Sequence, residues 1–413
     1  MTAQELRNTL KEIDHKSYPA YKSLRGSYNF GKYTLCIEHI QGDPFAAPSQ
    51  TSIHVLLKDA GFPDYTLASG TARTALADFL LRGFSSEIAH YSFQAKGSGK
   101  SGLIEITRPG QEVFSRSDCE ITDKELIVRF FIGFPANGRT INSRELEKIL
   151  FDFMPQCVEK SLMYKNLNPD KLRKHIFLAE DQQAIRCELS ARELTAFVAD
   201  GAVLPRESGM SQRPMKNAVT FSSPGTMRIT LNLPHAGNIS GMGIPRGITL
   251  IVGGGYHGKS TLLSALELGV YNHIAGDGRE YVISDETALK LRSEDGRFVK
   301  DVDISLFIND LPSRKDTHAF STEDASGSTS QAAGIVEGIE AGSRLFLIDE
   351  DTSATNFMVR DAFMQRVIQS DKEPITPFTA RAGELYDNAG ISTILVAGSS
   401  GAFFHIADTI IQM

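Results

Sequence analysis

The sequence has few cysteines, and none of them lie close together. Its 413 residues contain four, Cys36, Cys119, Cys157 and Cys187, with no C-x-x-C pair. This spacing argues against both a disulfide framework and a cysteine zinc site. We therefore expect reduced thiols and a cytoplasmic protein.

Long apolar runs are also absent. No stretch approaches the roughly 18 uncharged apolar residues of a membrane span, and the polar start at residues 1–5 does not resemble a signal peptide. No fixed-period repeat or low-complexity tract is evident. The 41% hydrophobic and 23% charged residues indicate an ordinary globular protein, long enough for two or three domains.

Charge is distributed unevenly along the chain. The net charge is −7, divided into +3 for residues 1–240 and −10 for residues 241–413. A mildly basic first part is compatible with a nucleic-acid partner. Because +3 over so many residues is no basic stripe, ordinary surface variation explains it as well.

The most informative stretch begins at residue 248. Ile248–Val252 is an apolar run typical of a buried parallel strand, residues 253–260 fit the phosphate-loop pattern G-x-x-x-x-G-K-[ST], and good helix formers follow. Backbone N–H groups of such a loop and the following helix N-terminus face phosphate oxygens. The residues expected to bind nucleotide here are Gly253, Gly254, Gly255, Tyr256, His257, Gly258, Lys259, Ser260 and Thr261.

Individual roles follow from the chemistry of this loop. Lys259 is expected to reach the β- and γ-phosphates, and the Ser260 hydroxyl to ligate Mg²⁺. Tyr256 and His257 occupy positions usually held by small residues, so their side chains must point away or contact nucleotide or a partner. For His257, packing and catalysis both stay open.

A second run supplies carboxylates. Residues 345–348 are apolar and precede Asp349 and Glu350, so a buried strand would present both acids at the sheet edge where the phosphate loop opens. Asp349 is placed to hold Mg²⁺ through its water shell, and Glu350 to polarise the water that attacks the γ-phosphorus.

A third motif lies between the phosphate loop and the acidic strand. The hydroxyl-rich residues 326–331 open a helix, and they could bind an anion or merely cap that helix.

The rest of the chain divides into three parts. Residues 1–200 are expected to form an α+β domain, 201–227 an irregular connector, and 228–413 the nucleotide-binding domain, with mixed sheet and flanking helices. Helices are predicted at 2–14 and 71–84, in a segment capped by Ser143, and with interruptions to about Ala196. Residues 97–102 look like a flexible basic loop, and Arg206 in the connector could face phosphate or solvent.

Together these motifs resemble ATP-binding-cassette domains. Residues 253–261 resemble the cassette phosphate loop, 326–331 its signature loop, 345–350 its acidic strand and 351–356 the loop that crosses to a partner subunit. The whole chain resembles the predicted ABC-class ATPase family of stand-alone proteins. Further runs typical of that family are HIQGDPFAAPS at 39–49, AFVADGAVLP at 196–205, GMGIP at 241–245 and YNHIAGDGRE at 271–280.

The resemblance implies an ATPase that uses ATP and Mg²⁺ and has no membrane helices. Two copies would face head to tail, each ATP held between one copy's Lys259 loop and the other's Ser326, Gly327 and Ser328. Relatives are linked to RNA, so the partner expected for residues 1–200 is nucleic acid. A cassette usually offers a histidine after its late strand, where this chain has Ser399 and Ser400 as substitutes.

Two alternatives and one expectation about chain length remain. The missing histidine is also compatible with a slow or non-catalytic ATP-dependent protein scaffold. A small-molecule kinase is disfavoured, because the signature-like loop is present and no acceptor site is evident. Residues 410–413 end the chain directly after a predicted sheet strand, so we expect the natural protein to continue beyond Met413.

Overall fold

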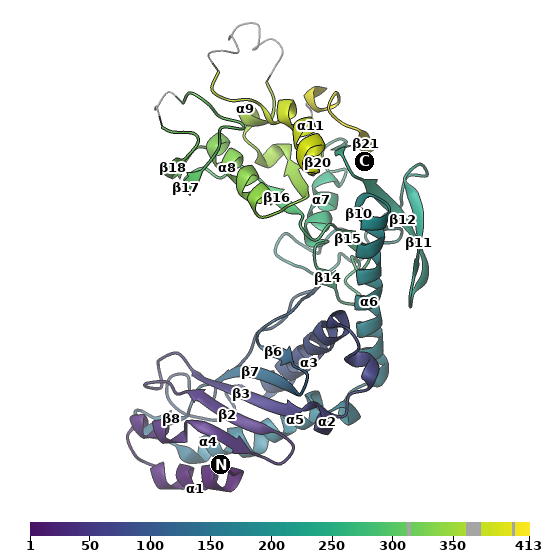
Figure 1. Ribbon diagram of the computed structural model, residues 1–413. Coiled ribbons are helices and arrows are strands. Elements are labelled where there is room, and N and C mark those ends of the chain that lie inside the picture. Colours follow the sequence, from purple (N-terminus) through teal and green to yellow (C-terminus); the bar gives the residue numbers. More distant parts are fainter. Residues whose placement is uncertain (312–314, 361–372, 399–400) are drawn as a thin grey trace. The chain divides into compact units, whose positions relative to one another are not determined.

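The computed structural model describes residues 1–311, 315–360, 373–398 and 401–413 (Figure 1). These residues form two compact units, the first comprising 1–180 with 273–275 and the second 181–272 with 276–413. The division falls inside helix α6 (Pro169–Ala191), earlier than the predicted boundary at residue 200. Among the described residues, no helix is long and apolar enough to cross a membrane.

The first unit is built on an antiparallel sheet with the order β1-β2-β3-β7-β4, to which β6 is added beside β7. Its strands are β1 (Gly26–Asn29), β2 (Thr34–His39), β3 (Ser49–Leu56), β4 (Ile104–Glu105), β6 (Cys119–Ile121) and β7 (Glu125–Ile132). The helices are α1 (Ala3–Ile13), α2 (Leu57–Ala60), α3 (Gly70–Tyr91), α4 (Ser143–Glu147), α5 (Met154–Ser161) and the start of α6. Short strands are β5 (Glu112–Val113), β8 (Ala136–Asn137) and β9 (Thr140–Ile141).

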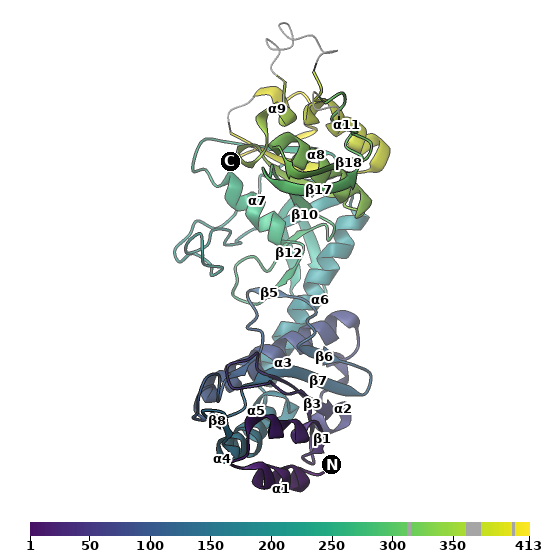
Figure 2. The same cartoon turned by 90° about the vertical axis from the view of Figure 1, so that its left-hand side faces the viewer.

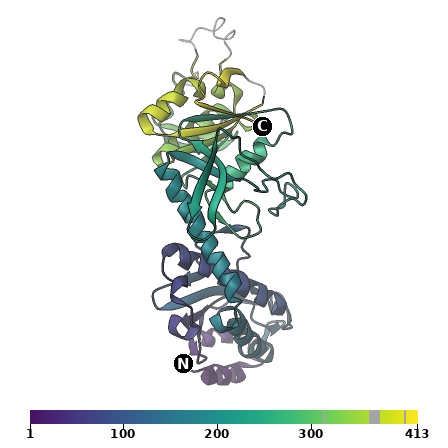
Figure 3. The same ribbon diagram turned by 90° about the vertical axis from the view of Figure 1, so that its right-hand side faces the viewer.

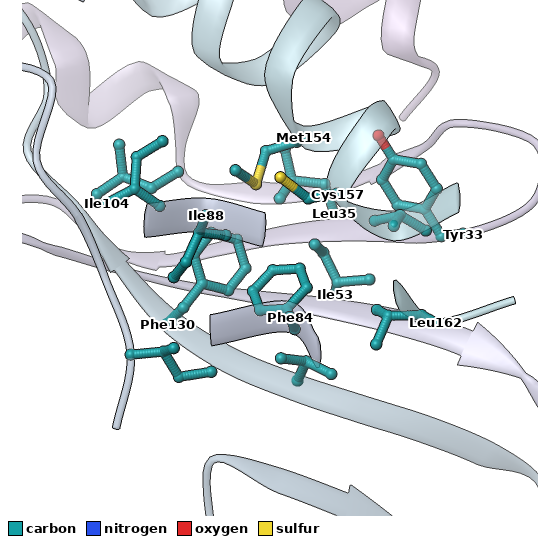
Figure 4. Close-up of a cluster of buried hydrophobic side chains, with 14 of the residues drawn as sticks. Tyr33, Leu35, Ile53, Phe84, Ile88, Ile104, Phe130, Met154, Cys157 and Leu162 are labelled. Atoms are coloured by element: carbon teal, nitrogen blue, oxygen red, sulfur yellow. The ribbon is translucent and has the colours of Figure 1, made fainter. Parts of the chain in front are cut away.

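One face of this sheet makes the core. Because side chains alternate along a strand, Leu35, Ile53 and Phe130 point to the same side. They pack with Phe84 and Ile88 of α3, as Figure 4 shows. Fully burying an apolar side chain of this size is worth ~1.5–3 kcal/mol. The opposite face of the sheet carries polar side chains such as His54 and Arg129 together with the apolar Ile127 and Phe131.

A buried carboxylate ties three segments of the first unit together. Asp78 of α3 has no exposed side-chain surface, and it accepts from Arg82 Nε at 2.6 Å and from an Arg116 guanidinium nitrogen at 2.7 Å. His175 of α6 lies 3.3 Å away. Burial opposes ionisation of Asp78, but the hydrogen bonds from His175 and Arg82 hold its pKa below the ordinary value.

Several predicted elements are confirmed and two are wrong. The predicted helix at 2–14 is α1, which Thr2 and Glu5 close in a capping box. The residue that caps α4 is Asn142, whose side chain accepts from Glu145 N, and not Ser143. Helical structure ends at Ala191 rather than near 196, because residues 194–199 form a strand of the second unit.

The second unit contains two larger sheets. The parallel sheet has the order β16-β19-β20-β13-β21, and the antiparallel sheet has the order β11-β12-β10-β15. The parallel strands are β13 (Ile248–Val252), β16 (Leu289–Leu291), β19 (Leu345–Asp349), β20 (Ser392–Ala397) and β21 (Thr409–Gln412), seen from the side in Figure 3. The antiparallel strands are β10 (Leu194–Ala199), β11 (Arg228–Leu233), β12 (Gly237–Pro245) and β15 (Val282–Ser284).

Helices and the antiparallel sheet bury both faces of the parallel sheet. On one face, Leu250 and Ile348 pack with side chains of α8 (Gly327–Glu340) and α11 (Phe378–Ala389). On the other, Ile251 and Leu347 pack with α7 (Lys259–Leu268) and the antiparallel sheet. Burial on both sides explains why the central strands β13, β19 and β20 are rich in Ile, Leu and Val. Helix α8 also packs against the antiparallel pair β17 (Arg297–Val302) and β18 (Phe320–Ala325) (Figure 2).

The remaining short elements lie in and around the second unit. They are β14 (Asn272–His273) and α9 (Thr355–Met358). The predicted connector, residues 201–227, contains no helix and no strand and belongs to the second unit.

Candidate nucleotide-binding site

Strand register aligns the ends of three central strands. Val252 of β13 pairs with Ala397 of β20, and Asp349 of β19 pairs with Val396, the residue before it. All three strands run parallel, so their carboxyl ends meet at one sheet edge. The phosphate loop (residues 253–260) and the Asp349–Glu350 pair therefore begin at the same row of the sheet, as the sequence predicted.

The phosphate loop needs unusual backbone conformations. Gly258 has φ +91° where it caps α7, and Tyr256 has φ +62°. The Lys259 ammonium donates to the carbonyl oxygens of Gly253 at 2.7 Å and Gly254 at 2.9 Å, so the side chain folds back over the loop. This leaves Lys259 beside the helix N-terminus, where phosphate oxygens bind in such loops.

The two large side chains of the loop point in different directions. Tyr256 is fully exposed. The imidazole Nδ1 of His257 lies 3.2 Å from the Met413 carbonyl oxygen, and its ring lies next to Gly254. This contact supports the packing role considered for His257, because it holds the loop against the end of β21.

The carboxylates of Asp349 and Glu350 have different surroundings. Asp349 is buried at the end of β19, and its Oδ1 accepts from Asp351 N at 3.2 Å. Glu350 extends toward β20, where its Oε2 accepts from Gly398 N at 2.8 Å. The Gly398 N–H therefore orients the Glu350 carboxylate at the sheet edge. Ser400, the predicted substitute for a cassette histidine, lies outside the described residues, as does Ser399.

The signature-like loop caps helix α8. The Ser326 Oγ accepts from Thr329 N at 3.4 Å, and it lies 3.4 Å from the Ser328 Oγ. A Cβ on Gly327 would come within 2.5 Å of the Ser293 Oγ, so a larger residue here would have to displace that hydroxyl. Together with Ser328, Gly327 leaves the helix N-terminus lined with small polar groups.

A buried glutamine links this helix to the loop after the acidic strand. The Gln331 side chain donates to Ser353 Oγ at 3.1 Å and accepts from Ala354 N at 3.0 Å. Two hydrogen bonds therefore join residues 353–354 directly to α8. Sequence analysis assigned residues 326–331 and 351–356 to separate motifs and missed this connection.

The residues at the sheet edge fit a magnesium ion. Ser260 is exposed in the first turn of α7, and Asp349 ends β19. Mg²⁺ takes hard oxygen ligands, and at phosphate sites it is held by one or two protein oxygens together with phosphates and water. Among the described residues, no group of three or more His, Cys, Asp or Glu could hold a metal by itself. The Ser260 and Asp349 oxygens therefore fit a Mg²⁺ ion that phosphates also help to coordinate.

A cavity of about 600 Å³ opens beside the phosphate loop. Residues 256–258 and Thr261 form one wall, and residues from the predicted connector and the chain end form the others. Three apolar side chains on its lining are exposed: Tyr256, Val219 and Met215. These lining residues are far apart in the chain, so no local pattern in the sequence could predict the cavity.

Two interactions hold the connector in place. Arg206 pairs with the buried Asp277 at 2.9 Å, so it faces neither phosphate nor solvent. Phe221 N donates to Ala202 O at 2.8 Å. The irregular segment that lines the cavity is therefore anchored at both ends.

A parallel sheet whose strand, glycine-rich loop and helix meet an acidic strand at one edge defines a P-loop nucleotide-binding protein. Residues 168–413 match the P-loop domain of the ABC ATPase family, and residues 3–165 match the N-terminal domain of ATPases of the ABC class. The chain therefore belongs to the ABC-class ATPases.

Two individual proteins can be compared with the chain. An uncharacterised protein of Methanocaldococcus jannaschii is 32% identical over 188 residues, which span 43% of this chain and 42% of that protein. The chain is also similar to the solved structure of cbiO1 from Clostridium perfringens, part of the ABC transporter complex cbiONQ. That likeness has 12% identity and a TM-score of 0.30, and covers 54% of this chain and 85% of the other.

Proposed function

We propose that this ATPase hydrolyses ATP at a site shared by two copies of the chain and uses the cycle to clamp a nucleic acid, with RNA favoured. The observation that carries the ATPase part is the common row formed by the phosphate loop, Asp349 and Glu350. Lys259 would bind the β- and γ-phosphates, and Glu350 would take a proton from the attacking water. Ser260 and Asp349 would hold Mg²⁺, which neutralises charge on the phosphates.

The signature-like loop is proposed to complete the site of a second copy. Its support is chemical, since the N-terminus of α8 offers backbone N–H groups and the Ser326 and Ser328 hydroxyls. The link from Gln331 to Ser353 and Ala354 would transmit closure of the site to the loop at 351–356. Binding of ATP would then favour the closed pair, and hydrolysis would favour opening.

The cavity beside the phosphate loop is proposed to take the adenine base. A flat aromatic ring would cover the exposed apolar side chains of Val219, Met215 and Tyr256. The loop next to the cavity would hold the phosphates of the same molecule.

Replacing Val219 by aspartate is expected to raise the Kd for ATP about tenfold, because a carboxylate would lose hydration against the base. Affinity for inorganic tripolyphosphate, which has no base, should change less than about twofold. Calorimetry with both ligands measures the difference. Met210→Asp is the matched control, since Met210 is fully exposed in the same segment but does not line the cavity. Equal losses for both ligands would contradict the assignment.

The nucleic-acid surface is proposed at a set of interlocked loops in the first unit. Lys100 N donates to Pro44 O at 2.7 Å, and Ser98 N donates to Ala136 O at 2.8 Å. A Cβ on Gly99 would meet Pro44 O at 2.4 Å, so the loops approach too closely for any other residue. Residues 97–102, predicted to be flexible, are therefore joined to Pro44 and Ala136 by backbone hydrogen bonds.

These loops carry both kinds of group that bind single strands. Phe45 is 62% exposed and Phe93 is 55% exposed. Lys96 and Arg139 are exposed as well, with Lys100 half-buried beside them in the chain. Single-stranded nucleic acids are bound by cations that contact phosphates and by aromatic rings on which bases stack. A rigid loop cluster of this composition would bind RNA with little ordering cost.

We expect single-stranded RNA to bind at low salt and to stimulate ATP turnover, with affinity falling steeply as salt rises. Changing Lys96, Lys100 and Arg139 together to alanine should lower the slope of log Kd against log salt by about 2. Lys58→Ala, an exposed lysine of α2, is the control. Failure of RNA and DNA to bind or to alter turnover would overturn the proposed function. Binding that the triple variant leaves unchanged would overturn only this surface.

A further inference from the structure

Two exposed phenylalanines lie in the loop cluster that the proposed function assigns to nucleic acid. Phe45 and Phe93 expose more than half of their surface, although phenylalanine is among the residues most often buried. Phe93 N donates to Gly102 O at 2.7 Å. Lys100, in the same loop as Gly102, donates its backbone N–H to Pro44, the residue before Phe45. Both rings are therefore carried by one set of loops that backbone hydrogen bonds join.

Phe93 has a backbone conformation that a bulky side chain disfavours. Its φ is +61°, in the left-handed region that glycine and asparagine adopt at much lower cost. The residue follows Ser92, the C-cap of α3, where glycine or asparagine commonly ends a helix. Residues held in such sparsely populated conformations are concentrated at binding and active sites. The chain thus keeps a large exposed ring where folding alone favours glycine or asparagine.

The turn that carries Phe45 is fixed by side-chain hydrogen bonds. Asp43 Oδ1 accepts from Phe45 N at 2.8 Å. The buried side chain of Gln41 donates to Asp43 O at 3.1 Å and accepts from Phe134 N at 3.3 Å. A Cβ on Gly99 would lie 2.9 Å from Phe45 Cδ1, so the glycine backbone lies directly beside the ring. A ring positioned in this way before binding loses little conformational freedom when a ligand covers it.

Each ring has a lysine close to it along these loops. Lys100 bonds through its backbone to the residue before one ring, and Lys96 follows the other ring by three residues. The Lys96 N–H donates to Glu145 Oε2 at 2.9 Å, but the Glu145 carboxylate already pairs with the Lys148 ammonium. One ring and one lysine can therefore serve one base and its neighbouring phosphate, and the loops offer this combination twice.

We infer that Phe45 and Phe93 each stack on one unpaired base, so that the site takes single-stranded RNA and rejects duplex RNA. Bases in a duplex stack on one another and present only their edges in the grooves, where a phenylalanine ring cannot cover their faces. Every base has a π-face, so this contact selects unpaired strands without reading their sequence. The inference rests on the proposed nucleic-acid function, to which it adds the state of the strand and the residues that hold its bases.

Equilibrium binding of single-stranded RNA to the full chain, measured over a range of salt concentrations, tests this assignment. Phe45→Ala and Phe93→Asn should each raise the Kd about tenfold, through the loss of one stacked base. The slope of log Kd against log salt should match wild type, because stacking releases no counterions. Phe298→Ala changes an equally exposed phenylalanine of β17 and should alter the Kd less than about twofold. The same strand annealed to its complement should bind at least about tenfold more weakly.

Two further measurements separate a binding role from a structural one. Asparagine tolerates the backbone conformation at position 93, so the Tm of Phe93→Asn should equal or exceed that of wild type while RNA affinity falls. A lower Tm with unchanged RNA affinity would overturn the role of Phe93. RNA of the same length without bases should bind wild type, Phe45→Ala and Phe93→Asn equally, because only the ring–base contact is removed. Unequal binding of this abasic RNA would also overturn the assignment.

The outcomes also distinguish this inference from the proposed function. If no RNA bound at any salt concentration, the proposed function would fail together with the stacking. RNA binding with a steep salt dependence, but with equal Kd values for single and double strands, would overturn only the stacking. Unchanged RNA affinity in both Phe45→Ala and Phe93→Asn would likewise overturn it, and would leave the two exposed rings to a protein partner.

Discussion

Glutamine at position 350 is expected to lower the rate of ATP hydrolysis by about 10²–10⁴, because the amide cannot take a proton from the attacking water. The substitution keeps the shape of the side chain, and its oxygen can still accept from Gly398 N as Glu350 Oε2 does at 2.8 Å. ATP affinity should stay near the wild-type value, since Lys259 and the phosphate loop are unchanged. Phosphate release in single-turnover experiments and ATP binding measure the two quantities separately.

Glu340→Gln is the matched control for this variant. Glu340 is an exposed glutamate at the last residue of α8, at the opposite end of that helix from Ser326, so the same substitution there should change turnover less than about threefold. Normal turnover in Glu350→Gln would contradict the assigned role. Undetectable turnover in the wild type, with ATP-dependent dimerisation intact, would instead favour the slow or non-catalytic scaffold.

A mixture of two inactive variants is expected to recover activity if the site is shared between subunits. Lys259→Ala removes the phosphate-binding ammonium, and Ser328→Glu places a negative charge at the start of α8. In a mixed dimer one site carries both defects, and the other has an intact phosphate loop facing an intact α8. Equal amounts should regain about a quarter of wild-type turnover, since half the dimers are mixed and half their sites are intact.

The control pairs two variants that damage the same side of the site. Lys259→Ala mixed with Glu350→Gln leaves every mixed dimer without an intact site and should stay inactive. Steady-state phosphate release after overnight exchange of subunits measures both mixtures. No recovery with Lys259→Ala and Ser328→Glu would refute the shared site, as would full activity in the control.

Much of the nucleotide-binding sheet could be predicted because its signals are local. A strand buried on both faces is mostly apolar, as residues 345–348 are throughout and residues 248–252 are except for Thr249. The predicted unit of strand, glycine-rich loop and helix is confirmed by β13, Gly258 with its positive φ, and α7. Register between parallel strands then brought Asp349 to the same edge, since buried strands of similar length end together.

Local sequence patterns could not predict the boundary between the two units. Helical character was predicted to about Ala196, yet residues 194–199 form β10 between β12 and β15. Their hydrogen-bond partners, 241–245 and 282–284, lie more than 40 residues away. Periodicity within a short window carries no information about those partners, so the helix was extended and the boundary placed too late.

What the sequence alone determined is therefore the chemistry that neighbouring residues can carry: a phosphate loop, an acidic strand end and a small-residue helix start. Only the tertiary structure decided which distant groups meet, such as Val219 with Tyr256 around the cavity and Gln331 with Ser353. The physical reason is that side-chain contacts across strands and loops depend on register and close packing. These are properties of the folded chain as a whole and not of any short segment of it.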